Sequence, residues 1–140
     1  MSEILITKRE RDCLLAITEN SKSDFPIRLS DLANILEIKP PTALNIVKRL
    51  SELGLVRNER GMIRPTEKGV VYYKEIIYHH RILECILKNS GVDEVKSCVE
   101  AAKLDYQLPH ELVEKMEEYA GNPRECPHGK PIEKPKEVIL

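Results

Sequence analysis

The residues best able to do chemistry in this sequence are four cysteines, four histidines and 23 carboxylates. The cysteines are widely spaced and form no CxxC pair, which indicates free thiols rather than a disulfide framework. Cys126 and His128 are two residues apart, but one cysteine and one histidine lack the four ligands of a structural zinc site. These residues could form a metal site, but their numbers alone do not show where it lies.

Motifs of the common enzyme classes are missing from the sequence. It contains no glycine-rich phosphate loop and no HExxH motif, and no serine or cysteine has an evident base and orienting partner. The sequence therefore predicts a protein that is not an enzyme and takes no small organic substrate. No apolar run reaches the roughly 18 residues of a membrane span, and the N-terminus has no signal-peptide pattern. We expect a cytoplasmic protein without a membrane partner.

Charge is distributed unevenly along the chain. Residues 39–64 carry six basic and two acidic side chains, although the whole chain has a net charge of −1. Residues 66–140 carry 11 basic and 14 acidic side chains. A basic half joined to an acidic half indicates a unit that faces nucleic acid and a separate second unit.

Hydrophobic periodicity predicts the elements that must position these side chains. The 140 residues are 41% hydrophobic, and helices are expected over residues 7–20, from an N-cap at Ser30, and from Pro40 to about Gly54. Two short strands around a turn at residues 59–61 follow, and then a helix of roughly 20 residues that opens at Thr66. Two more helices are expected after Gly91 and from Pro109. The first of these places Val95, Cys98 or Val99, Ala102 and Asp105 on one stripe.

This order of elements predicts a mainly α protein with an N-terminal winged helix-turn-helix and a C-terminal helical unit. We assign residues 1–70 to the first domain, 71–125 to the second and 126–140 to an irregular tail.

In a winged helix-turn-helix, the helix that begins at Pro40 enters the major groove of DNA. Asn45 offers both a donor and an acceptor to adenine, and Thr42 reaches a phosphate or a base edge. Basic side chains on this helix, on the wing and before the second helix suit phosphate contacts. They are Arg28, Lys39, Lys48, Arg49, Arg57, Arg60 and Arg64. The alternative is a merely solvated helix face beside a structural hairpin.

Several stretches of the chain resemble the family of the diphtheria toxin repressor and the manganese transport regulator. They are RLSDLANILEIKPPTALNIVKRLSELGLV, RPTEKG, HHRILE, GVDEVKSCVEAAKLDY and GNPRECPHGKPI. The resemblance covers nearly the whole chain and corresponds to the short members, which lack an SH3-like domain. It implies a homodimeric, metal-dependent transcriptional regulator, most simply a repressor, that binds palindromic operator DNA and dimerises through its C-terminal domain.

The resemblance also implies a set of metal ligands. Asp12 matches a ligand in the first helix, and His80 and Glu84 match a histidine and a glutamate on one face of the long helix. Cys98 stands where iron-type members have a histidine, and Asp105 stands where others have a glutamate. A cation shared by Asp12 and the later ligands would fix the spacing of two recognition helices, and so link metal binding to DNA binding.

The sequence departs from the family at other ligand positions. Leu15 replaces a second carboxylate of the first helix, Ala102 cannot bind a metal, and Tyr106 stands where a histidine is usual. The resemblance implies Fe(II) or Mn(II), and because thiolate is a soft ligand, Cys98 favours Fe(II), Co(II), Ni(II) or Zn(II) over Mn(II).

Two alternatives to metal regulation remain open at the level of the sequence. One is a winged-helix regulator that has lost its metal dependence and responds to a thiol or redox signal, for which Cys13 is the candidate. The other is a winged-helix module for protein–protein contacts.

Overall fold

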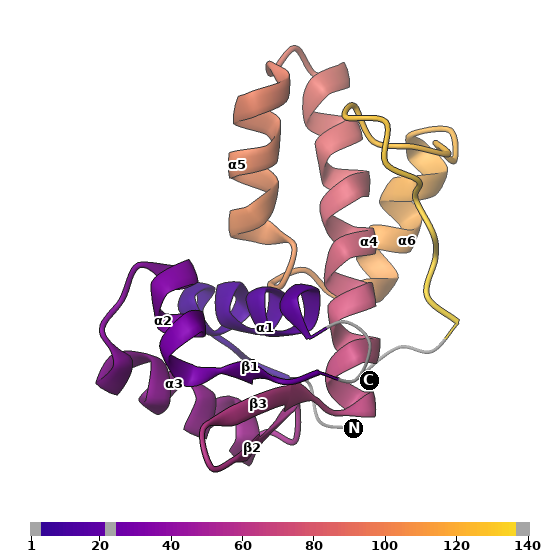
Figure 1. Ribbon diagram of the computed structural model, residues 1–140. Coiled ribbons are helices and arrows are strands. Elements are labelled where there is room, and N and C mark those ends of the chain that lie inside the picture. The colour runs from indigo at the N-terminus through magenta and orange to yellow at the C-terminus, as the bar shows by residue number, and fades with distance from the viewer. Residues whose placement is uncertain (1–3, 22–24, 137–140) are drawn as a thin grey trace. The chain divides into compact units, whose positions relative to one another are not determined.

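The computed structural model describes residues 4–21 and 25–136, and the chain divides into two compact units. The first unit runs to Tyr73 and the second begins at Lys74, so the division falls within helix α4 (Glu67–Asn89) (Figure 1). The described part is mainly helical and carries one small sheet, which confirms the predicted fold class. Among the described helices, none has the length and apolar character that a membrane crossing requires.

Three helices form the core of the first unit: α1 (Lys8–Asn20), α2 (Leu29–Leu36) and α3 (Pro40–Glu52). Thr7 caps α1, because its hydroxyl accepts from the amide of Glu10 and the Glu10 carboxylate accepts from the amide of Thr7. Proline at the first position of α3 costs no hydrogen bond there and presets the helical φ. The apolar sides of the helices meet at Leu14, Ile17, Leu32, Val47 and Leu50, all fully buried.

The start of α2 differs from the prediction. The helix begins at Leu29 with Arg28 as its N-cap, so Ser30 lies inside the first turn and is not the cap. Arg28 makes no side-chain capping bond. Instead, the backbone before the helix is held by strand pairing, a non-local contact that the capping rule does not take into account.

The wing is a three-stranded antiparallel sheet in the order β1-β3-β2. Strands β2 (Val56–Glu59) and β3 (Met62–Pro65) form the predicted hairpin, and β1 (Ile27–Arg28) adds a third strand that was not predicted. Arg60 and Gly61 both have positive φ, 53° and 81°, as the two central residues of a type I′ turn require. The turn is closed by the Asn58 carboxamide, which accepts from the amide of Gly61 at 2.9 Å.

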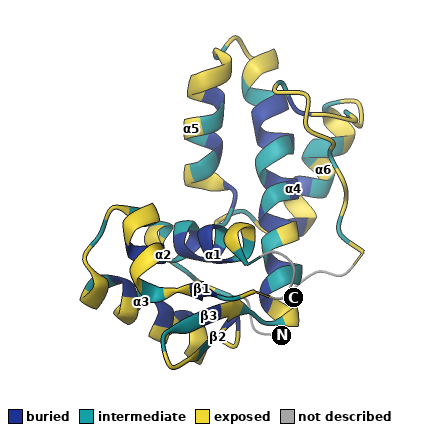
Figure 2. Cartoon of the chain, viewed as in Figure 1, coloured by how far each residue is buried: buried dark blue, intermediate teal, exposed yellow. Residues whose placement is uncertain are grey.

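The second unit consists of the rest of α4, α5 (Glu94–Leu104), α6 (His110–Tyr119) and a following segment with one isolated bridge, Glu125 to Pro131. Its core is formed by Tyr78, Ile82 and Val113. Figure 2 shows the corresponding buried face along α4. The predicted helices after Gly91 and from Pro109 are therefore confirmed.

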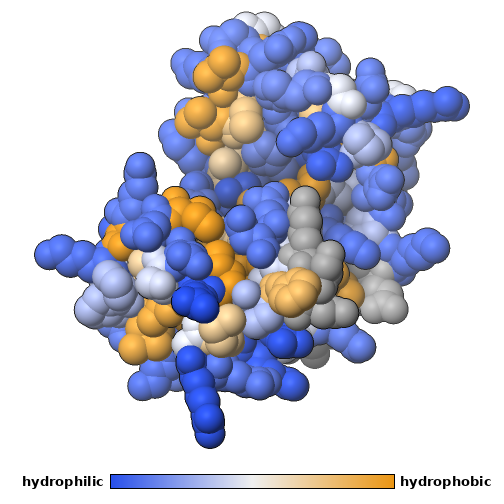
Figure 3. Space-filling model, viewed as in Figure 1, coloured by the Kyte–Doolittle hydropathy of each residue, from blue (hydrophilic) through white to orange (hydrophobic). Residues whose placement is uncertain are grey.

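Helix α5 buries a different face from the one suggested by its apolar residues. Ser97 and Ala101 are fully buried, whereas Val95 and Val99 are 74% and 51% exposed. Figure 3 shows the resulting hydrophobic surface over α5. The two valines are four residues apart, so they lie on one helix face that nothing in the described chain covers.

Candidate functional sites

Helix α3 buries one face in the first unit and presents the other to solvent. Ala43, Val47 and Leu50 form the buried face, while Asn45 and Lys48 are exposed. Of the nine residues predicted to contact DNA, Thr42 is half-buried and the other eight are exposed. The exposed polar face of α3 therefore has the side-chain chemistry needed to read base edges.

The exposed face of the sheet carries three of the predicted arginines. Arg57 and Arg64 are directly opposite each other in the β2–β3 pairing, and Arg28 lies on β1. Like charges at directly opposed positions destabilise a strand pair. Arg57 has a partial counterion in Glu59, 4.0 Å away. An anion bound over Arg57 and Arg64 would remove the remaining repulsion.

Arg49 has partners within the first unit. Its guanidinium lies 3.8 Å from the Glu10 carboxylate and donates at 3.5 Å to the carbonyl of Leu5. This arginine therefore ties α3 to the start of α1, in addition to any contact with DNA.

In the second unit, His80, Glu84 and Cys98 form a cluster whose possible ligand atoms all lie within 4.8 Å of one another. The Nε2 atom of His80 is 3.2 Å from Glu84 Oε1 and 3.6 Å from Cys98 Sγ. Cys98 comes from α5, so the cluster joins two helices of one unit. The structure brings together three of the residues that the resemblance implied.

Asp105 contacts the other side of the same imidazole. Its Oδ2 atom is 2.9 Å from His80 Nδ1, and its side chain is fully buried. Burial by itself lowers the pKa of His80, but hydrogen bonds to Asp105 and Glu84 outweigh burial and raise the pKa to about 10. Asp105 thus holds the ring of His80 so that Nε2 points at Glu84 and Cys98, which is the usual role of an outer carboxylate in a metal site.

Glu84 also belongs to a second cluster, with Cys126 and His128, whose donor atoms again lie within 4.8 Å of one another. His128 Nδ1 is 2.9 Å from Glu84 Oε2. Sequence reasoning set this Cys-x-His pair aside because two ligands are too few. Glu84, about 40 residues earlier, adds a third possible ligand, and no local spacing reveals that contact.

The donor atoms of these clusters fit a divalent transition metal. Within the described part of the chain, the buried Oε2 atom of Glu84 accepts no hydrogen bond of proper geometry, although His128 is close. A buried carboxylate oxygen left without a hydrogen bond is costly unless a cation satisfies it. Burial raises the pKa of Glu84, but the hydrogen bond from His80 and the charges of His80 and His128 outweigh it and lower the pKa. The group is therefore ionised and able to bind a metal.

Two residues singled out from the sequence lie in the first unit. The Asp12 carboxylate is 2.8 Å from Lys8 Nζ and 2.9 Å from the Arg11 guanidinium, so two cations already neutralise it. Cys13 is fully buried, and burial raises its pKa to about 12, with the charges of Glu10 and Asp12 adding to the rise. A redox sensor needs an exposed thiolate of low pKa, and Cys13 has neither property.

Known families and structures resemble both units. Residues 6–61 match the iron dependent repressor N-terminal DNA binding domain, and residues 66–134 match the iron dependent repressor metal binding and dimerisation domain. An uncharacterised HTH-type transcriptional regulator of Methanocaldococcus jannaschii is 36% identical over 104 residues, which cover 73% of this chain and 81% of that relative.

Two solved structures extend the comparison. A hypothetical protein from Sulfolobus solfataricus has 31% identity and a TM-score of 0.81, covering 92% of this chain and all of the other. The manganese regulator SloR has 25% identity and a TM-score of 0.79, covering 96% of this chain. Only 64% of the SloR chain is covered, so this chain spans less than two thirds of that longer relative.

Proposed function

Because the chain belongs to the iron-dependent repressor family, whose members are transcriptional regulators and not enzymes, we propose that it is a homodimeric, metal-responsive regulator. The family is the one that the sequence motifs indicated, that of the diphtheria toxin repressor and the manganese transport regulator. In our proposal, α3 and the wing bind a palindromic operator, and the second unit responds to a metal ion and represses transcription when the ion is bound.

The buried carboxylate of Glu84 is the observation that carries this proposal. Oε1 lies 3.2 Å from His80 Nε2 and Oε2 lies 2.9 Å from His128 Nδ1, so a single side chain belongs to two donor clusters. If Glu84 served only in a structural ion pair, one neighbouring histidine would be enough. Two sets of imidazole, carboxylate and thiol around a side chain that is 3% exposed are better explained by metal binding.

The donor chemistry favours one group of metals. Each cluster contains a cysteine, and a thiolate prefers Fe(II), Co(II), Ni(II) or Zn(II) to Mn(II). When bound, the ion supplies positive charge that holds α4, α5 and the segment around residue 126 together. Among the chain's own residues, Asp105 orients His80 and Glu84 supplies the shared negative charge.

Exposed apolar surface on α5 supports the dimer. Val95 and Val99 lie side by side, and the matching family domain is a dimerisation domain. A dimer also suits DNA recognition, since two recognition helices read half-sites one helical turn apart. We propose that a second copy of this chain covers the two valines.

Metal removal tests the proposal. We expect the metal-free protein to bind DNA from upstream of its own gene more weakly than the protein loaded with Fe(II), by roughly 5–150-fold, the range of typical allosteric coupling. Fluorescence anisotropy at fixed salt, with Fe(II), Zn(II) and Mn(II) in parallel and EDTA to reverse each effect, measures the difference. Equal affinity with and without metal would favour a regulator that has lost metal dependence. Absence of DNA binding in both states would favour a protein-interaction module.

Phosphate contacts are tested by the salt dependence of the same assay. Lys48→Ala and Arg64→Ala should each weaken binding to specific and random duplexes alike and reduce the slope of log affinity against log salt by about 0.9. Lys115→Ala is the matched control, because Lys115 is an exposed cation on α6 and should leave the slope unchanged. An unaltered slope in both wing and α3 variants would count against this DNA face.

A further inference from the structure

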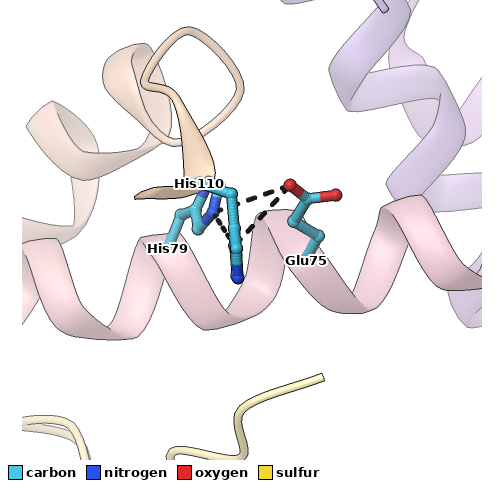
Figure 4. A group of neighbouring side chains, drawn as sticks. All are labelled: Glu75, His79 and His110. Atoms are coloured by element: carbon cyan, nitrogen blue, oxygen red, sulfur yellow. Dashed lines mark hydrogen bonds and ion pairs between the residues drawn. The ribbon is translucent and has the colours of Figure 1, made fainter. Parts of the chain in front are cut away.

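A third group of possible ligands lies in the second unit, apart from the two clusters that share Glu84. It consists of Glu75 and His79 on α4 and His110 at the start of α6 (Figure 4). All three side chains are at least nine-tenths buried. None of the three was singled out from the sequence, since their spacing along the chain carries no metal motif.

The three ligand atoms are arranged around a common point. His79 Nε2 is 2.9 Å from His110 Nδ1, and Glu75 Oε1 is 3.6 Å from His110 Nδ1 and 4.0 Å from His79 Nε2. A point equally distant from three atoms with these separations lies about 2.1 Å from each, which matches Zn–N and Zn–O bond lengths of about 2.0–2.2 Å. The side chains therefore need little rearrangement to hold an ion.

Each histidine also has an outer partner suited to a metal ligand. His79 Nδ1 donates at 2.9 Å to the carbonyl of Asp105, which leaves the lone pair of Nε2 directed at the cluster. His110 Nε2 lies 3.6 Å from the Glu114 carboxylate, on the side away from the cluster. His79 thus makes the outer hydrogen bond that is usual for a metal-binding histidine, and His110 has a carboxylate near its second ring nitrogen.

The protonation states suit a cation as well. The carbonyl of Asp105 can only accept, so His79 Nδ1 carries the hydrogen and His79 Nε2 keeps its lone pair. In the metal-free protein His110 Nδ1–H donates to His79 Nε2. Moving that proton to Nε2 of His110, beside Glu114, frees both ligand nitrogens without loss of a proton to solvent.

We propose that Glu75, His79 and His110 form an additional binding site for a borderline divalent transition ion of the Zn(II) or Co(II) class. The site holds two nitrogens and one oxygen and contains no sulfur, so it differs chemically from the two clusters around Glu84. It joins α4 to α6. Asp105 links it to the Glu84 clusters, because its carbonyl holds His79 while its carboxylate holds His80.

Cobalt distinguishes the sites in the full-length protein. Co(II) bound to thiolate shows a sulfur-to-metal charge-transfer band in the near ultraviolet, whereas Co(II) bound by two histidines and a glutamate shows only ligand-field bands in the visible. We expect His110→Gln to bind one Co(II) fewer per chain than the wild type, by equilibrium dialysis, with the charge-transfer band unchanged. His128→Gln is the matched control and should reduce that band while keeping the sulfur-free ligand-field bands.

The result that overturns the proposal is a His110→Gln protein with wild-type stoichiometry and an unchanged visible spectrum. If far-ultraviolet circular dichroism shows that this variant does not fold, Glu75→Gln replaces it, since glutamine keeps the shape and removes the charge. That variant should lower the affinity of the sulfur-free site by at least about 10-fold. Unchanged affinity would equally reject the site. Neither result depends on DNA binding, so failure here is distinct from failure of the regulatory function.

Discussion

Replacing Gly69 with alanine is expected to destabilise the first unit by about 3 kcal/mol, a large effect for a change of one methyl group. A Cβ atom at this position would lie 1.9 Å from the carbonyl oxygen of Leu55 and 2.9 Å from its carbonyl carbon. That carbonyl cannot easily move away, because it accepts a hydrogen bond at 3.0 Å from the amide of Thr66. Helix α4 therefore packs directly on the backbone that leads into β2.

The expected change in stability has the opposite sign to that of a glycine-to-alanine substitution at an ordinary exposed position in a helix. In an exposed helix, glycine to alanine stabilises by roughly 1 kcal/mol. Here the clash should lower the thermal midpoint of the first unit by roughly 12 °C or more. Differential scanning calorimetry measures the shift, with Lys74→Ala as an exposed control on the same helix that should change stability by less than about 0.5 kcal/mol. A Gly69→Ala protein as stable as the wild type would refute the close approach.

Most helices could be predicted from the sequence because local signals define their ends. Thr7 with Glu10 marks the start of α1, and Pro40 marks the start of α3. The β2–β3 hairpin could be predicted from two short strands on either side of a turn at residues 59–61. The structure places Arg60 and Gly61 in that turn with positive φ. Strand β1 could not be predicted in this way, since two residues carry no alternation and their pairing with β3 spans more than 30 positions.

The contacts among the candidate metal residues also divide into local ones, which the sequence predicts, and non-local ones, which it does not. His80 and Glu84 are four apart on one helix, so their proximity follows from helix geometry alone. The contacts of Glu84 with His128, and of His79 with His110, depend on how α6 and the segment after it pack against α4. That packing is set by Tyr78, Ile82 and Val113, whose apolar character is visible in the sequence but whose partners are not.

Replacing Glu84 with glutamine is expected to have the largest effect on function. Glutamine preserves the shape of the side chain but removes the charge shared by both cysteine-containing clusters. The amide nitrogen that replaces one carboxylate oxygen is a donor and does not bind a cation. Loss of an outer partner already costs 10–100-fold in metal affinity, so loss of this shared ligand should lower the affinity of both clusters by at least about 100-fold.

The effect of Glu84→Gln on DNA binding distinguishes a loss of metal regulation from a loss of folding. We expect Glu84→Gln to bind operator DNA with the affinity of the metal-free wild type and to show no gain on addition of Fe(II) or Zn(II), in the anisotropy assay described above. Glu100→Gln is the matched control, because Glu100 is a carboxylate on α5 that pairs with Lys103 at 3.1 Å and lies outside both clusters. A Glu84→Gln protein that folds and still gains affinity with metal would show that the response arises from other ligands.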